Sequence, residues 1–172
     1  MRKFGLLLIA LLLAAPRADA CNLPHGERPD LATRLATSGK STAGFQVSAG
    51  VSGSWFDAAR NGEGIIVEIL PDGRALAIWF TYPAPGEPGE QAWLIAQDGV
   101  IEGDRIRFSQ VYRPIGARFG PAFDPAQLQV QQWGTLELQF SSCNTSTATW
   151  TGPASYGSGS RAMTRLSTLD EV

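Results

Sequence analysis

LELQF, residues 136–140, alternates apolar and polar side chains without interruption. In an extended chain its three apolar side chains lie on one face, and these are Leu136, Leu138 and Phe140. A period of two is typical of an antiparallel strand with one buried face and one hydrated face. The stretch therefore predicts a β-strand and argues against a helix here.

The same alternation recurs upstream. RALAIWFTY, residues 74–82, has large side chains on one face, and on the other Trp79 lies among small residues. The stretch DRIRFSQVY places Ile106, Phe108 and Tyr112 together on one face. Both stretches are predicted strands, and the pattern leaves open which face of residues 74–82 is buried.

Five further stretches have strand-like composition, near 53–57, 63–70, 91–101, 145–151 and 159–167. Glycine- and proline-containing turns such as Pro71-Asp72-Gly73 separate them. About eight strands with short connections and no long helix predict an all-β protein. We expect a single antiparallel domain, either an up-and-down barrel or a two-sheet sandwich.

One break between strands is unusually long, RPIGARFGPAFDPAQLQVQQ at residues 113–132. Connections in compact domains are commonly much shorter, so this segment is either a functional loop or a packed cap. Its two phenylalanines, Phe119 and Phe123, predict that it packs against another part of the protein.

The first 20 residues have the pattern of a signal peptide. Arg2 and Lys3 precede an apolar run of 12 residues, and Ala18-Asp19-Ala20 is a small-x-small cleavage site. The run is too short to span a bilayer. We therefore expect an exported protein, periplasmic or secreted, with residues 1–20 removed.

Cys21 and Cys143 are the two cysteines of the chain. In an oxidising compartment such a pair commonly forms a disulfide, which would tie the new N-terminus to the domain. The alternative is a lipid anchor on Cys21 with Cys143 free, although the residues before Cys21 fit a lipoprotein signal poorly.

Residues 21–50 have few large apolar side chains and are expected to be an N-terminal leader, followed by a β domain at residues 51–172. Without residues 1–20 the chain has 11 Lys+Arg against 15 Asp+Glu, a net charge of −4. That balance argues against a nucleic-acid partner. No segment after the signal is apolar enough for a transmembrane span, and we expect none.

No residue is assigned a catalytic role from the sequence. GVSGS, residues 50–54, has Ser54 where a nucleophile elbow requires glycine. His25 is the sole histidine and lies in the leader, so neither a triad nor a metal site is expected. No glycine-rich loop leads from a strand into a helix, so we expect no nucleotide cofactor. Carboxylates suited to glycoside hydrolysis are present, namely Glu63, Glu68, Asp98, Glu102, Asp104, Asp124 and Glu137.

The segment before the second predicted strand has two interpretations. Asp57, Asn61 and Glu63 carry oxygen ligands of the kind that bind calcium, but their spacing does not match an EF-hand loop. Alternatively this is a corner between two strands, in which Gly62 and Gly64 allow positive φ and the polar side chains bond to the local backbone.

The five tryptophans are the main candidates for ligand binding, and they are Trp55, Trp79, Trp93, Trp133 and Trp150. Trp79 and Trp150 each share a strand face with alanines. Indoles on such a face stack on a flat ligand or a sugar ring if the face is open. If the face is closed they fill the space that the alanines leave in the core.

The long break holds a second candidate group. Tyr112, Arg113, Arg118 and Phe119 place cations beside aromatic rings, a composition suited to an anionic group. An ion pair between one of these arginines and Asp124 of the same segment would explain the composition equally well.

Several stretches together resemble a group of exported bacterial proteins. They are GSWFDAARNGEGIIVEILPDGRALAIWFTY, QAWLIAQDGVIEGDRI, YRPIGARFGPAFDP, WGTLELQF, the Cys-Asn pair and GSGSRAMTRL, which lie within about residues 52–167. The group carries G-S-W-[FY]-x-x-x-R-x-G-x-G followed by a W-F-T-Y strand. The resemblance implies export and a single module, and it implies no activity.

A weaker resemblance is to the avidin family of eight-stranded barrels. Gly53-Ser54-Trp55 is similar to the opening strand of that family, and residues 147–152 to its T-x-x-W-x-G near the end. The insertion at 113–132 departs from the family pattern, so no biotin-binding residues are carried over.

These observations predict an exported, non-enzymatic β module that binds a small molecule, a glycan or an envelope component. The residues expected to bind it are Trp79, Trp93, Trp150, Tyr112, Arg113 and Arg118. Two alternatives remain open: a carboxylate-dependent hydrolase of envelope polysaccharide, and a structural or inhibitory module that binds another protein.

Overall fold

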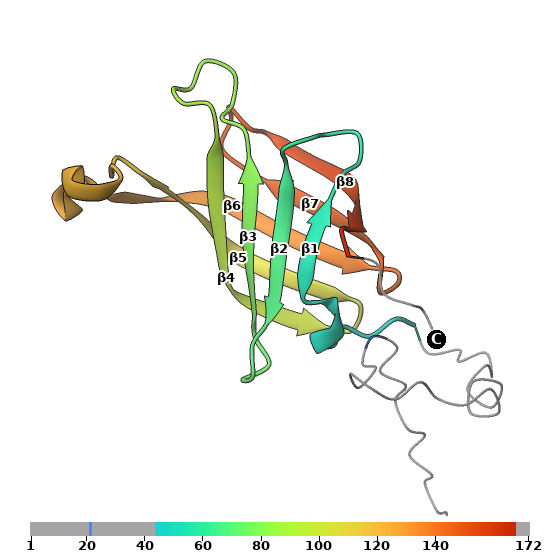
Figure 1. Cartoon of the computed structure of the whole chain (residues 1–172). Coiled ribbons are helices and arrows are strands. Elements are labelled where there is room, and N and C mark those ends of the chain that lie inside the picture. The colour runs from blue at the N-terminus through green and yellow to red at the C-terminus, as the bar shows by residue number, and fades with distance from the viewer. Residues whose placement is uncertain (1–20, 22–43, 168–172) are drawn as a thin grey trace, which may run out of the picture.

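The structure is a computed structural model that describes Cys21 and residues 44–167. The expected signal peptide and most of the expected leader therefore lie outside the described residues. Eight antiparallel strands follow one another around a closed barrel, and the last strand pairs with the first (Figure 1). The strands are β1 (Gly53–Phe56), β2 (Gly64–Ile69), β3 (Ala75–Thr81), β4 (Ala92–Glu102), β5 (Arg105–Ile115), β6 (Gln129–Phe140), β7 (Thr145–Thr151) and β8 (Ser158–Arg165). The all-β prediction is confirmed, and the architecture is the barrel rather than the sandwich.

The stretch at 136–140 behaves as its alternation predicts. Leu136, Leu138 and Phe140 point into the barrel and are at most 2% exposed. Leu136 lies opposite Phe108 of β5, and Leu138 opposite Ala148 of β7. Cross-strand pairs of this kind fix the register, because a shift by one residue would turn every apolar side chain outward.

The face of β3 that carries Trp79 is the inner one. Three buried tryptophans, Trp55, Trp79 and Trp133, share the interior with alanines on the neighbouring strands. Those alanines are Ala75, Ala77, Ala92, Ala96 and Ala148. An eight-stranded barrel leaves inside only the width that side chains can fill, so large rings require small residues opposite them.

A β-bulge in β5 corrects one expectation. The pairing between β5 and β6 shifts register between Phe108 and Val111. Val111 is therefore the next fully buried residue after Phe108, and Tyr112 faces outward. The expectation that Tyr112 shares the face of Ile106 and Phe108 is wrong, because the extra residues of the bulge exchange the two faces.

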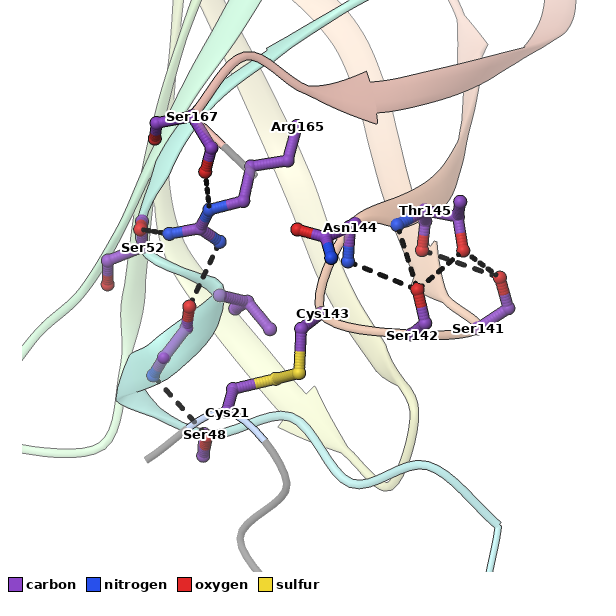
Figure 2. The surroundings of a disulfide bond; sticks show 12 residues. Cys21, Ser48, Ser52, Ser141, Ser142, Cys143, Asn144, Thr145, Arg165 and Ser167 are labelled. Carbon is purple, nitrogen blue, oxygen red and sulfur yellow. Dashed lines mark hydrogen bonds between the residues drawn. A yellow bond between two sulfur atoms is a disulfide. The ribbon is translucent and has the colours of Figure 1, made fainter. Parts of the chain in front are cut away.

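Arg165 closes one end of the barrel. β1 and β8 are joined by a short seam, in which Trp55 lies opposite Arg165. The Arg165 guanidinium donates to the carbonyl oxygens of Gly50 at 2.9 Å, of Ser167 at 3.0 Å and of Ser52 (Figure 2). It also lies 5.5 Å from the centre of the Trp55 ring. Burial lowers the pKa of Arg165, and its backbone acceptors compensate the buried charge.

The disulfide lies at the same end. Cys21 and Cys143 are bonded, with their Cα atoms 5.6 Å apart and 122 positions apart in the chain (Figure 2). The predicted cysteine pair is confirmed, and the Sγ of Cys21 is not available for a thioether to a lipid. By chain entropy a loop of this length contributes about 4–5 kcal/mol. The bond fits a protein of an oxidising compartment.

The long break is in part an extension of two strands. β5 and β6 continue into residues 113–132, hereafter the arm, and the arm projects from the barrel with 3₁₀ turns at its far end (Figure 1). Those turns are η2 (Gly120–Ala122) and η3 (Pro125–Gln127); a third, η1 (Ala49–Val51), precedes β1. Phe119 is fully exposed and Phe123 is 55% exposed, so the expectation that they pack against another part of this chain is wrong. Among the described residues, no helix is long and apolar enough to cross a membrane.

Replacing Phe140 should test the packed interior. Phe140 is 1% exposed, and its ring meets Trp55 edge-on at 5.1 Å. We expect Phe140→Ala to lower the free energy of unfolding by about 3–5 kcal/mol. Val130→Ala, on the exposed part of the same strand, should change it by less than about 0.5 kcal/mol. Urea unfolding measures both, and equal effects would contradict the packing described here.

Candidate functional site

The end of the barrel opposite the disulfide holds a cluster of aromatic rings. Trp79 meets Trp133 at 5.7 Å and Trp150 at 5.3 Å between ring centres, both edge-to-face. Tyr156, after β7, meets Trp133 in the same way at 5.3 Å. Two of the predicted binding residues, Trp79 and Trp150, are therefore brought together, but Trp79 is only 5% exposed. At Trp79 the space-filling interpretation describes the structure better than an open stacking face.

A buried cation covers this cluster. The Arg161 guanidinium lies 4.9 Å from the Trp150 ring centre and 5.6 Å from that of Trp79. It forms an ion pair with Glu63, whose carboxylate also accepts a hydrogen bond from Thr81 at 3.2 Å. Both partners of the pair are largely buried, so charge, ring faces and hydroxyl hold one another in place.

Arg161 was not among the site residues expected from the sequence. Period-two alternation in RAMTR, at the end of the chain, places Arg161, Met163 and Arg165 on one face of β8. Met163 and Arg165 are indeed buried. The signal was therefore present, but arginine is seldom expected inside a barrel. Two buried donors in this region, Trp133 Nε1 and Arg161 Nε, have no hydrogen-bond partner among the described residues.

A second polar group fixes the base of the arm. Arg113 is ion-paired with Glu87 of the β3–β4 connection, which also accepts from Tyr156 at 3.0 Å and Ser155 at 3.1 Å. The hydrogen bond from Arg113 is the main reason that the pKa of Glu87 lies below its usual range. Burial is the main reason that the pKa of Tyr156 is raised. Arg113 is thus a structural tether in this arrangement.

Neither predicted arginine of the arm pairs with Asp124. Asp124 accepts from the backbone nitrogen of Ala126 at 2.9 Å and caps η3. Among the described residues Arg118 has no hydrogen-bond or ion-pair partner, and it is exposed near the end of the arm. The structure therefore separates Arg118 from Arg113 and from the tryptophans.

The segment between β1 and β2 is a corner. The Asp57 carboxylate accepts from the backbone nitrogen of Ala59 at 2.9 Å, and Tyr82 donates to the carbonyl oxygen of Asn61 at 2.9 Å. Gly62 has φ +82°, and a Cβ there would lie 2.1 Å from the Tyr82 hydroxyl. The Glu63 carboxylate is bound to Arg161, and the oxygen atoms of Asp57 and Asn61 stabilise the corner through hydrogen bonds. These three residues therefore do not form a cation site.

Trp93 lies on the outside of the barrel, apart from the inner cluster. It is 46% exposed and lies opposite Phe80 of β3, which is 45% exposed. Beside these two rings is a hollow of about 600 Å³. Its lining consists of Gly62, Ile78, Phe80, Thr81, Gln91, Ala92 and Trp93. The hollow is mainly apolar, with the amide of Gln91 at its edge.

The hollow continues into an apolar surface on three strands. Ile66, Ile78 and Ile95 lie side by side across β2, β3 and β4. With Phe80 and Trp93 they form what we call the outer face. Ile95 in turn lies opposite the outward-facing Tyr112 of β5, so two predicted binding residues, Trp93 and Tyr112, border the same surface.

Most candidate carboxylates are already engaged. Ion pairs or local hydrogen bonds hold six of the seven acids considered above, namely Glu63, Asp98, Glu102, Asp104, Asp124 and Glu137. Glu137 shows the effect clearly, because the hydrogen bond from Arg107 lowers its pKa. In the described part of the chain no group of three His, Cys, Asp or Glu residues is placed to hold a metal ion.

Comparison with known proteins adds no family assignment: no protein-family model, no curated protein and no solved structure matches the chain. The eight-stranded antiparallel barrel agrees with the weaker, avidin-like expectation at the level of architecture. The functional argument therefore has to come from the surfaces of this barrel.

Removing the carboxylate from the buried ion pair should lower the free energy of unfolding. Glu63→Ala leaves the Arg161 charge buried against Trp79 and Trp150, and we expect a loss of about 3 kcal/mol in unfolding free energy. The double variant Glu63→Leu, Arg161→Met should lose less, because it removes both charges. Urea unfolding of the three proteins checks this, and a double variant that is less stable than Glu63→Ala would contradict it.

The contribution of the Arg113–Glu87 ion pair to the free energy of unfolding should depend on pH. Because the pKa of Glu87 is lower in the folded protein, its stabilising contribution is present above the unfolded value, about 4.3, and disappears as the pH falls through the folded value. Wild type should therefore exceed Glu87→Gln in unfolding free energy near neutral pH, and the difference should narrow on acidification. Glu90→Gln, in the same connection, is the matched control. A difference that grows in acid would contradict the assignment.

Proposed function

We propose that this chain is an exported, non-enzymatic binding module whose binding site is the hollow beside Trp93 and Phe80. The observation that carries the proposal is the exposure of two neighbouring aromatic rings on paired strands. Exposed aromatic residues that line a concave, mostly apolar surface are typical of ligand sites.

The chemistry of the hollow favours a flat ring with polar edges. The faces of Trp93 and Phe80 suit stacking, and the Gln91 amide, which has no hydrogen-bond partner among the described residues, offers a donor and an acceptor. A sugar ring combines an apolar face with hydroxyl groups at its edge. We therefore infer a glycan as the ligand class, and the engaged state of most acids favours binding over hydrolysis.

The features expected of an exported protein support the same inference. The disulfide and the signal-like residues 1–20 suit a protein that meets glycans of the cell envelope or its surroundings. In this proposal Trp93 binds directly and Tyr112 borders the site, whereas Trp79, Trp150 and Arg113 support the barrel behind it.

Calorimetric titration with soluble oligosaccharides of glucose and of N-acetylglucosamine tests the proposal. We expect one series to bind, and Trp93→Ala to weaken its affinity by about tenfold or more. Val100→Ala is the matched control, because Val100 is an exposed residue farther along the same strand. Unchanged affinity in Trp93→Ala, or no heat of binding with any oligosaccharide up to about 10 mM, would refute it.

A further inference from the structure

The end of the arm exposes large apolar side chains that no other part of the described chain covers. Three large apolar side chains beyond the last strand pair of the arm are exposed, and these are Phe119, Phe123 and Leu128. Phe119 is exposed over its whole surface. Apolar side chains gathered at one exposed tip are typical of a surface that another molecule covers.

The arm holds this tip at a defined place. Arg113 is bound to Glu87 at the base, and Ile115 is paired with Gln129 further along. At the turn, Gly116 has φ +91°, and a Cβ there would lie 2.1 Å from the carbonyl oxygen of Gln127. The ribbon leads away from the barrel (Figure 1), so the tip does not cover the outer face of its own chain.

Within the residues that the structure describes, the unpaired charges are complementary. Of the eight arginines in the described part of the chain, Arg118 is the one without a hydrogen bond or ion pair, and it precedes Phe119. Among the acids of that part, Glu68 and Glu90 have no such partner. Glu68 is exposed on β2 beyond Ile66, and Glu90 precedes Gln91 at the hollow. The cation is therefore on the arm, and Glu90 is the anion beside the hollow, whereas Glu68 lies at the other end of the outer face.

We propose that the partner of the arm is a second copy of this chain, and that Phe119 of one copy occupies the hollow beside Trp93 of the other. Arg118 then faces Glu90 beside the hollow. The proposal rests on the proposed function only in that both use the hollow as a binding site; here its occupant is a phenylalanine ring instead of a sugar. Oligosaccharide and dimerisation therefore compete for the same site.

The closed form of this contact that uses the fewest copies is a two-fold dimer. Each copy supplies one arm and one outer face, so a reciprocal exchange closes after two copies and forms the same junction twice. Standard protein interfaces bury roughly 800 Å² on each partner. A single tip in a single hollow is small on that scale, and the exchange doubles it.

Sedimentation velocity over a range of protein concentrations tests the dimer on the purified, disulfide-bonded protein. Wild type should pass from monomer to dimer as concentration rises. Phe119→Ala and Trp93→Ala should each raise the dimer dissociation constant by about tenfold or more. Arg118→Glu should weaken the dimer as well, and adding Glu90→Arg to it should restore part of the affinity.

Mixing the variants gives the sharpest readout. The Phe119→Ala homodimer has two defective arms and the Trp93→Ala homodimer has two defective faces, so each lacks an intact junction. A mixture of the two forms a heterodimer with one intact junction, and it should dimerise more tightly than either variant alone. Val100→Ala is the control that should behave as wild type.

The outcomes distinguish this proposal from the glycan site. Wild type that remains monomeric at every concentration, or a dimer that Phe119→Ala leaves unchanged, overturns the arm exchange. Phe119→Ala leaves the hollow intact, so oligosaccharide binding measured in that variant tests the glycan site alone. Circular dichroism of each variant confirms the fold, which substitution of the fully exposed Phe119 should not disturb.

Discussion

The width of an eight-stranded barrel limits everything that this chain can place inside it. Eight strands leave an interior that side chains just fill. Here Trp55, Trp79 and Trp133 use that space, and alanines such as Ala77 and Ala148 on the neighbouring strands make room for them. The inner faces therefore serve the core. A binding role of the kind proposed therefore has to use the outer face or the arm, where aromatic and charged side chains are exposed.

Two buried arginines complete the barrel by different means. Arg165 neutralises its charge on backbone carbonyl oxygens at the disulfide end, whereas Arg161 uses the Glu63 carboxylate at the opposite end. Both lie against tryptophan rings, which offset part of the cost of removing a guanidinium from water. Arg165 thereby ties η1 to β8, and Arg161 ties the β1–β2 corner to the inner aromatic cluster.

The strands and their antiparallel order were predictable because alternation in stretches such as 136–140 depends only on burial of one face. Which face of residues 74–82 is buried could not be predicted, because both faces of that strand are apolar. The width of the barrel decides between them. A bulge, invisible in the hydrophobic pattern, turned Tyr112 outward. At the candidate site, residue type is enough to select Trp93 as a candidate, but its separation from Trp79 and its pairing with Phe80 depend on register.

The arm exposes apolar side chains at its tip, while its strand edges carry polar residues that disfavour aggregation. Beyond Tyr112 and Thr135 no further strand of the described residues pairs with the ribbon of β5 and β6, so both of its edges are unpaired there. Pro114 removes one backbone donor there, and glutamines, among them Gln129 and Gln131, keep the exposed edge polar. Apolar contact is thereby concentrated at the tip of the ribbon. A surface arranged in this way favours a single, defined docking geometry over edge-to-edge pairing of many chains.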